Sequence, residues 1–161
     1  MAAQRVAPDP ADLDGSGLRI ALVCGRFNDH ITQRLWAGAR RGLSGLGVID
    51  TDVTEVWVPG AFEIPLMAKT ILQSGRVDAV IGLGCVIRSE TTHYEAVAGE
   101  CAGGLQRVQL DTGMPAVFGV LTTEDLNQAL VRSEDPGGHN VGEEAAATAV
   151  EMARTLGRLR R

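Results

Sequence analysis

Residues 79–94 read AVIGLGCVIRSETTHY, and this stretch decides the fold. It begins as an apolar run typical of a buried strand, passes through a polar turn around Arg88 and Thr91, and enters a predicted helix at His93. A strand, a turn and a helix in this order form one unit of a parallel sheet with flanking helices. Backbone N–H groups at a helix N-terminus lack intrahelical partners, so the turn is also suited to hold an anion.

Three more units of the same kind surround this stretch. Apolar runs predict strands over residues 19–24, 53–58 and 116–121, besides the strand over 79–84. Each strand precedes a helical pattern, and Asn28 or Asp29 is a natural N-cap for the first of these helices. The element order is β-α-β-α-β-α-β-α-α. It predicts a three-layer α/β/α sandwich with a four-stranded parallel sheet, flavodoxin-like, whose ligands sit outside the carboxyl ends of the strands.

The two final helices carry local signals of their own. Residues 122–125 (TTED) resemble a capping box for a helix that runs to about Ser133. A polar loop over 133–140 follows, and then a last helix begins. One apolar stripe is expected to bury that helix, and it is formed by Ala145, Ala149, Met152, Leu156 and Leu159.

Length and composition favour one globular domain with an N-terminal extension. The chain has 161 residues, of which 45% are hydrophobic and 22% charged. Residues 1–17 hold prolines and glycines with little apolar periodicity, so they are predicted to form an arm, with the domain over 18–161. The net charge of −5 argues against nucleic acid as a partner. No apolar run is long enough for a membrane span, and no signal peptide is recognisable.

The cysteines and the absence of several known motifs reduce the number of reaction types that the sequence supports. Cys24, Cys85 and Cys101 are widely spaced in apolar surroundings, as reduced core thiols of a cytoplasmic protein are. The glycines at 82 and 84 lack the third glycine of a dinucleotide loop. The chain has no GxxxxGK[ST], HExxH, CxxC or GxSxG pattern, so P-loop, metal and serine-hydrolase chemistry have no support.

Aromatic and charged residues gather where the strands end. The chain has three Phe, two Trp and one Tyr, and Phe27, Phe62 and Tyr94 each follow a predicted strand. These rings either stack on a flat ligand or cap the edge of the sheet. His93 is either a solvent-facing residue or a proton carrier, and the helix N-terminus favours its neutral ring. Glu63 either stabilises a helix dipole or binds a ligand hydroxyl.

Four sequence blocks together resemble one enzyme family. They are residues 25–28 (GRFN), 58–65 (VPGAFEIP), 84–94 (GCVIRSETTHY) and 118–123 (FGVLTT). In this order and spacing they are similar to 6,7-dimethyl-8-ribityllumazine synthase, and the resemblance runs from about Arg19 to Leu156. It implies a transferase that condenses 5-amino-6-(D-ribitylamino)uracil with 3,4-dihydroxy-2-butanone 4-phosphate, the penultimate step of riboflavin biosynthesis. It implies no cofactor and no metal.

The resemblance also assigns site residues position by position. His93 is the expected proton donor and acceptor. The butanone phosphate is expected to bind backbone N–H groups of Glu90 and Thr91 and the side chain of Arg132. The ribitylaminouracil is expected to contact Phe27, which stacks on its ring, and Ala61, Phe62, Glu63, Cys85, Val86, Ile87 and Phe118, the last from a neighbouring subunit.

Partners and departures follow from the same resemblance. Family members assemble as pentamers, some build sixty-subunit icosahedral shells, and an association with riboflavin synthase is a further partner to consider. Residues 138–142 (GHNVG) lack the lysine that the family commonly has there, and His139 is a candidate substitute. Glu90 puts a carboxylate beside the expected phosphate site. Two other functions stay open: an archaeal-type riboflavin synthase, and a non-catalytic lumazine-binding, flavin-binding or shell-forming paralogue.

Overall fold

One parallel sheet organises the molecule. The computed structural model describes residues 5–161, and within them it has a four-stranded sheet with the spatial order β2-β1-β3-β4. The chain changes direction between β1 and β3, as in flavodoxin-like sheets. The predicted α/β fold with four parallel strands is confirmed. The strands are β1 (Ile20–Gly25), β2 (Val53–Val58), β3 (Ala79–Ile87) and β4 (Ala116–Thr123).

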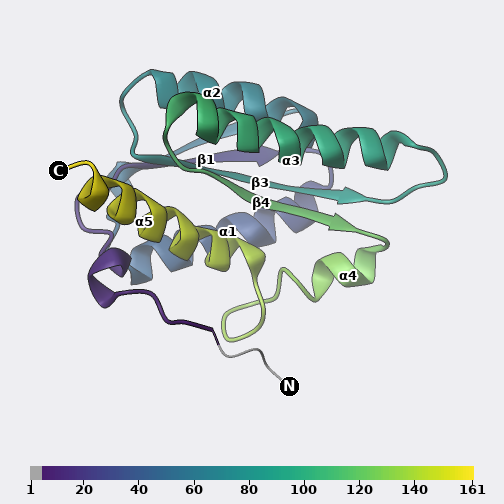
Figure 1. Cartoon of the computed structure of the whole chain (residues 1–161). Coiled ribbons are helices and arrows are strands. Elements are labelled where there is room, and N and C mark those ends of the chain that lie inside the picture. The colour runs from purple at the N-terminus through teal and green to yellow at the C-terminus, as the bar shows by residue number, and fades with distance from the viewer. Residues whose placement is uncertain (1–4) are drawn as a thin grey trace.

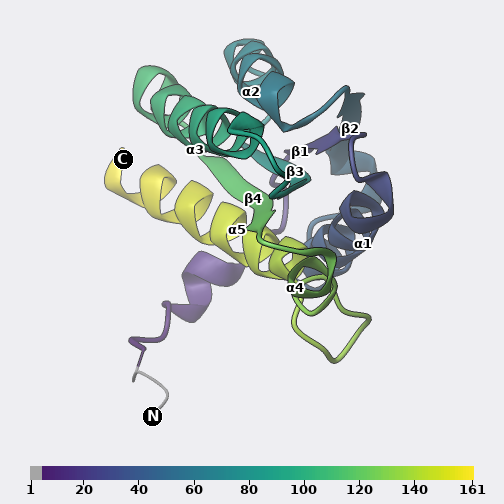
Figure 2. The ribbon, with the colours of Figure 1, turned by 90° about the vertical axis from the view of Figure 1, so that its right-hand side faces the viewer.

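Helices cover both faces of the sheet, which confirms the three layers. Helices α1 and α5 lie on one face and α2 and α3 on the other (Figures 1 and 2). Short α4 follows β4 and lies beside the carboxyl ends of the strands, on the face of α1 and α5 (Figure 1). The helices are α1 (Asp29–Gly45), α2 (Ile64–Gln73), α3 (His93–Thr112), α4 (Leu126–Leu130) and α5 (Val141–Leu159), with 3₁₀ helices η1 (Pro10–Leu13), η2 (Asp50–Asp52) and η3 (Ala61–Glu63).

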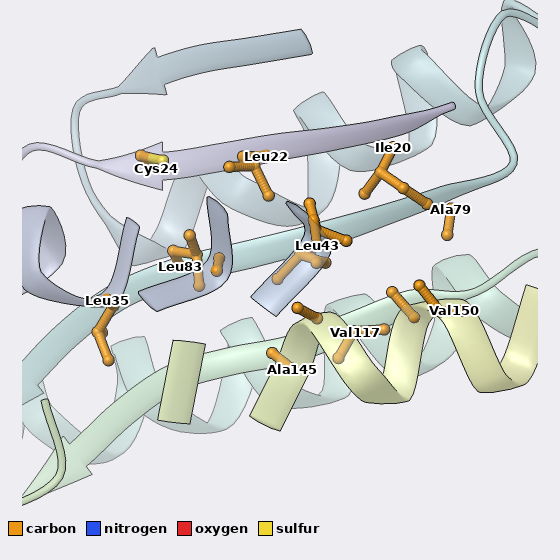
Figure 3. Packing of buried hydrophobic residues seen from close by; sticks show 14 of the residues in the cluster. Ile20, Leu22, Cys24, Leu35, Leu43, Ala79, Leu83, Val117, Ala145 and Val150 are labelled. Carbon is orange, nitrogen blue, oxygen red and sulfur yellow. The ribbon is translucent and has the colours of Figure 1, made fainter. Parts of the chain in front are cut away.

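The two central strands are buried on both faces, which explains why they read as continuous apolar runs. Alternate residues of β1, such as Leu22, point to the layer of α1 and α5, where Leu35 and Val150 meet them (Figure 3). The residues between them, such as Val23, pack against α2 and α3. At Gly82 in β3 a Cβ atom would lie 2.8 Å from the side chain of Ile64, so α2 comes close to the sheet only because this residue is glycine.

Some element ends differ from the sequence predictions. Strand β3 extends three residues past 84, because it pairs with β4 as far as Ile87 and Thr123. The helix predicted to run to about Ser133 ends at Leu130. That prediction is wrong because Ser133 forms a bridge with Asn140 and its hydroxyl donates to a carbonyl of the helix's last turn. Asp125, at the end of the expected capping box, caps α4 through the N–H of residue 128.

The predicted stripe of α5 is buried only in its first half. Ala145 and Ala149 are in the core as expected, but Met152 is 40% exposed and Leu159 is 71% exposed. The other buried residues of this helix are Gly142, Ala146 and Val150. The prediction is wrong for Met152 and Leu159, because the last turns of α5 run to the amino end of the sheet, where η1 covers only one side (Figure 1).

The N-terminal segment packs against the last helix. Asp12 in η1 is 8% exposed and accepts a hydrogen bond from Arg158 at 2.8 Å, and Arg154 donates to the Asp14 carbonyl at 2.5 Å. Residues 1–4 of the predicted arm lie outside the described residues, so the boundary at residue 17 stays a prediction. In the described part of the chain, no helix combines the length and apolar character that a membrane crossing requires.

Candidate active site

A cavity of the size of a small-molecule site lies at the carboxyl ends of β1, β2 and β3, next to the switch point of the sheet. It has a volume of about 470 Å³ and is lined by segments that follow three strands. Seven of the predicted site residues line it together. They are Phe27, Ala61, Phe62, Glu63, Cys85, Val86 and His93. Ligand sites of flavodoxin-like folds lie at this place, so the fold and the predicted residues agree on one position.

The turn after β1 is fastened to its neighbours on both sides. The N–H groups of Arg26 and Phe27 donate to the carbonyls of Val58 at 2.8 Å and Pro59 at 3.0 Å. On the other side, the Asn28 side chain donates to the Cys85 carbonyl at 2.9 Å. The Phe27 ring is 74% exposed, so it stands free over the cavity. An exposed aromatic ring on a fixed backbone is suited to stack on a flat ligand.

Asn28 lies at the N-cap of α1, as predicted, but its side chain makes no capping bond there. Its backbone has φ 59° and ψ 42°, in the left-handed region, and its amide group reaches Cys85 instead. The sequence reasoning missed this role. An Asn after a strand does signal tolerance of the left-handed region, but it does not reveal the partner of the side chain.

The turn after β2 meets the turn after β1 at a glycine pair. A Cβ atom on Gly25 would lie 3.2 Å from the Gly60 carbonyl carbon, so the two backbones touch. A Cβ atom on Gly60 would lie 3.6 Å from Glu63 Oε2 and 3.7 Å from Phe27 Cβ. The Glu63 carboxylate and the Cβ atom of Phe27 therefore flank the same glycine. This arrangement gives a hydrogen-bond acceptor beside a stacking surface.

The floor of the cavity is formed by the end of β3. Cys85 is 3% exposed and Val86 is 8% exposed, while Ala61 closes the side at 7%. Burial raises the pKa of the Cys85 thiol to about 11. The thiol therefore stays protonated near neutral pH and does not supply a thiolate nucleophile. Its contribution to the site is shape and the backbone groups around it.

His93 is the first residue of α3 and stands exposed at the cavity. Its N–H donates to the Thr91 hydroxyl at 3.3 Å, which fixes the start of the helix. Glu90 and Thr91 lie in the turn before the helix, and both are exposed but do not line the cavity. The geometry leaves the imidazole free to exchange protons with a ligand that rests on the floor.

Arg88 is already engaged within the chain. Its guanidinium lies 4.2 Å from the centroid of the Tyr94 ring, donates to Glu124 at 2.7 Å and also pairs with Glu95. The hydrogen bond from Arg88 holds the pKa of the Glu95 carboxyl below its ordinary value. Two carboxylates balance the charge of Arg88, so this arginine ties the first turn of α3 to the end of β4 and is not a free anion ligand.

Besides Glu90 and Thr91, three predicted site residues lie outside the cavity of their own chain. Ile87 is half-buried at the end of β3. Phe118 on β4 is 40% exposed and lines a second cavity, of about 360 Å³, between α3 and α5. Arg132 follows α4, and its side chain donates to the carbonyl of Gln128 at 2.9 Å. A single chain therefore brings together one part of the predicted site and leaves Phe118 and Arg132 on other surfaces.

The loop that lacks the expected lysine is held by acidic residues. The His139 side chain lies 3.1 Å from the Glu144 carboxylate, and its backbone N–H donates to Glu134 at 2.8 Å. His139 lines a small cavity of about 250 Å³ together with Glu143 and Glu144, apart from the cavity of His93. Within one chain, His139 is engaged by a carboxylate and not by the candidate site.

Comparison with protein families gives one match that covers most of the chain. The model of the family described as 6,7-dimethyl-8-ribityllumazine synthase matches residues 17–157. The matched region includes every strand and all seven cavity residues named above. The match begins just before β1 and ends within α5, so it covers the four strands, helices α1 to α4 and most of α5.

Proposed function

The chain belongs to the 6,7-dimethyl-8-ribityllumazine synthase family, and from this premise we propose that it condenses 5-amino-6-(D-ribitylamino)uracil with 3,4-dihydroxy-2-butanone 4-phosphate. The products are 6,7-dimethyl-8-ribityllumazine, phosphate and water, and the reaction is the penultimate step of riboflavin biosynthesis. The observation that carries the proposal is the convergence of Phe27, Glu63 and His93 on one cavity at the switch point of the sheet. A stacking ring, an acceptor and a proton carrier are what this condensation requires.

In this proposal the uracil ring stacks on Phe27, and its edge meets backbone groups of Cys85, Val86 and Ile87. Glu63, with Ala61 and Phe62, receives the ribityl chain, whose hydroxyls donate to the carboxylate. Support comes from the exposure of the Phe27 ring and from the position of Glu63 beside it. The apolar floor excludes water from the reacting amine.

The butanone phosphate binds at the start of α3. Backbone N–H groups of Glu90 and Thr91 face its phosphate, and Arg132 neutralises part of the charge. The Glu90 carboxylate turns to solvent, which its exposure allows. Arg88 is held by two carboxylates, so Arg132, which the family resemblance assigns to the phosphate, takes this role in the proposal.

The reaction then proceeds in three steps. The 5-amino group of the uracil attacks the ketone and forms a Schiff base with loss of water. Phosphate leaves by elimination as His93 transfers a proton. Loss of phosphate leaves an enol at C3 of the four-carbon unit, which tautomerises to a new carbonyl. The ribityl-bearing nitrogen then attacks this carbonyl, and a second water leaves as the ring closes. Alignment of two bound reactants contributes much of the rate, since effective molarities reach about 10⁵–10⁸ M in well-oriented cases.

The site is proposed to lie between subunits of a pentamer, in the cytoplasm. Phe118 and Arg132 lie outside the cavity that holds His93, which is expected if a neighbouring chain supplies them. Such a head-to-tail contact closes into a ring when the rotation per subunit fits. A shell of twelve pentamers and an association with riboflavin synthase are further proposals from family membership. The cysteines Cys24, Cys85 and Cys101 carry free thiols, which supports the cytoplasmic location.

The test is to mix the purified protein with both substrates and to follow lumazine absorbance and phosphate release. We expect His93→Ala to lower kcat by about 10²–10⁴-fold, the usual range for a proton-transfer group, with binding of a uracil analogue retained. His30→Ala is the matched control, because His30 is an exposed histidine in the first turn of α1. Absence of turnover above the uncatalysed rate would reject the synthase and leave the non-catalytic paralogue. Riboflavin formed from lumazine alone would instead indicate a riboflavin synthase.

A further inference from the structure

Asn28 is held in an unfavourable backbone conformation at the centre of the switch point. Among residues 5–161 it is the one non-glycine residue with a positive φ, at 59°. Asparagine tolerates this region better than most residues, but such a conformation persists only where the surroundings hold it. A residue of this kind beside a ligand cavity calls for a local explanation.

The side chain of Asn28 is directed away from its ordinary use. An asparagine at an N-cap usually accepts a hydrogen bond from the first turn of its helix. Here only the backbone carbonyl of Asn28 serves α1, accepting from the N–H groups of Ile31 at 3.0 Å and Thr32 at 3.1 Å. The amide group is thereby free to donate to the Cys85 carbonyl at 2.9 Å, 57 residues along the chain.

That hydrogen bond continues the sheet beyond the end of β1. The last paired residues of β1 and β3 are Cys24 and Leu83, and β3 then runs on past Gly25 to form the cavity floor. The side-chain amide of Asn28 donates to β3 where a further residue of β1 would otherwise pair. This hydrogen bond joins the turn after β1 to the cavity floor at the end of β3. Phe27 precedes it directly, so its backbone is fixed by β2 on one side and by β3, through Asn28, on the other.

We infer that Asn28 is a positioning residue, which sets the Phe27 ring over the floor of the cavity through its hydrogen bond to the Cys85 carbonyl. The inference rests on the proposed function where it is tested through the KM values of the two substrates. It predicts a selective effect on the substrate that stacks on Phe27. A residue that merely shapes a turn would affect stability and leave the balance between the two substrates unchanged.

The first experiment separates the backbone role of Asn28 from that of its amide. Asn28→Gly keeps the positive φ without strain and removes only the side chain. We expect its KM for the ribitylaminouracil to rise about tenfold, the upper range for one hydrogen bond, with the KM for the butanone phosphate within about twofold. Asn28→Asp, which replaces the donor by an acceptor, should show the same selectivity. Gln73→Glu, at the exposed end of α2, controls for the added charge.

A double-mutant cycle then tests whether Asn28 acts through Phe27. In a Phe27→Ala background, Asn28→Gly should change the KM of the ribitylaminouracil by less than about twofold, because the ring it positions is gone. Additive effects would overturn the inference, since they would mean that Asn28 contacts the substrate itself. Equal weakening of both substrates would overturn it as well.

One readout stands apart from the proposed function. Cys85 is 3% exposed under the turn, so loss of the Asn28 bond should speed its alkylation by iodoacetamide, read by mass spectrometry. Cys24 and Cys101, each fully buried, serve as internal controls. We expect Cys85 to react up to about tenfold faster in Asn28→Gly, by the same hydrogen-bond range. If the native chain has no turnover, the proposed function fails, and the alkylation rate alone decides this inference. An unchanged rate would overturn it.

Discussion

Replacement of Asn140 should destabilise the protein more than almost any other polar substitution in it. Asn140 is 3% exposed and makes three hydrogen bonds through its side chain. It caps α5 by accepting from the Glu143 N–H at 3.2 Å, and it donates to the carbonyls of Arg34 at 3.1 Å and Glu134 at 3.0 Å. One amide thus joins α1, the loop after α4 and the start of α5.

The magnitude follows from those bonds. Loss of an N-cap costs about 0.5–2 kcal/mol, and each hydrogen bond contributes about 0.5–1.5 kcal/mol. For Asn140→Ala we therefore expect a loss of about 2–4 kcal/mol, which corresponds to a fall in Tm of about 5–15 °C for a chain of this size. Asn140→Asp keeps the cap but turns a carboxylate toward two carbonyl oxygens. It should be at least as destabilised as the alanine variant.

Thermal unfolding followed by circular dichroism measures both variants. Asn127→Ala is the matched control, because Asn127 is an exposed asparagine in α4, and it should stay within about 0.5 kcal/mol of the native chain. If Asn140→Asp were as stable as the native chain, the two donated hydrogen bonds would contribute nothing and the reasoning would be refuted. An alanine variant within the range of the control would refute the capping argument as well.

Three other predictions concern the phosphate site, the ion pairs that Arg88 makes with Glu95 and Glu124, and the close packing of α2 against the sheet at Gly82. Arg132→Ala should raise the KM for the butanone phosphate at least about tenfold, as expected for a charged hydrogen bond, but leave an unphosphorylated analogue unaffected. Arg88→Gln should lower Tm at neutral pH, and thermal scans across pH should show the difference shrinking in acid. The reason is that the pKa of Glu95 lies below its ordinary 4.5 in the folded chain, so its stabilisation is present above that value and is lost as the pH falls through the lowered pKa. Gly82→Ala should cost about 1–3 kcal/mol in urea unfolding, because its Cβ would lie 2.8 Å from Ile64, and equal stability would contradict the packing argument.

Much of the fold was predictable because the central strands are buried on both faces. Strands β1 and β3 stand out as apolar runs, and the turns after them carry Phe27 and His93, which the structure brings to one cavity. The predicted burial of the α5 stripe was wrong for residues after Ala149, because periodicity does not reveal where the sheet ends beneath a helix. Met152 fits the pattern and yet is 40% exposed, beside a cavity that it lines with Leu110 and Met114.

The sequence predicted which residues belong to the candidate site, but it did not predict the hydrogen bonds and ion pairs that hold them. The hydrogen bond between Asn28 and Cys85 joins two strand ends that are remote in sequence, and no local pattern encodes it. The engagement of Arg88 by Glu95 and Glu124 is equally hidden, because those carboxylates come from different elements. The 40% exposure of Phe118 reflects the edge position of β4, which depends on the order of the strands and not on the composition of any one of them.

The packing of η1 on the last turns of α5 has a practical consequence for handling the protein. Both segments lie at the amino end of the sheet, across the molecule from the turns that hold Phe27 and His93 (Figure 1). An affinity tag joined after Arg161 would therefore emerge far from the mouth of the cavity of its own chain. Immobilising the protein by such a tag should leave that mouth open to solution, so that substrate binding can be measured on a sensor surface without removing the tag.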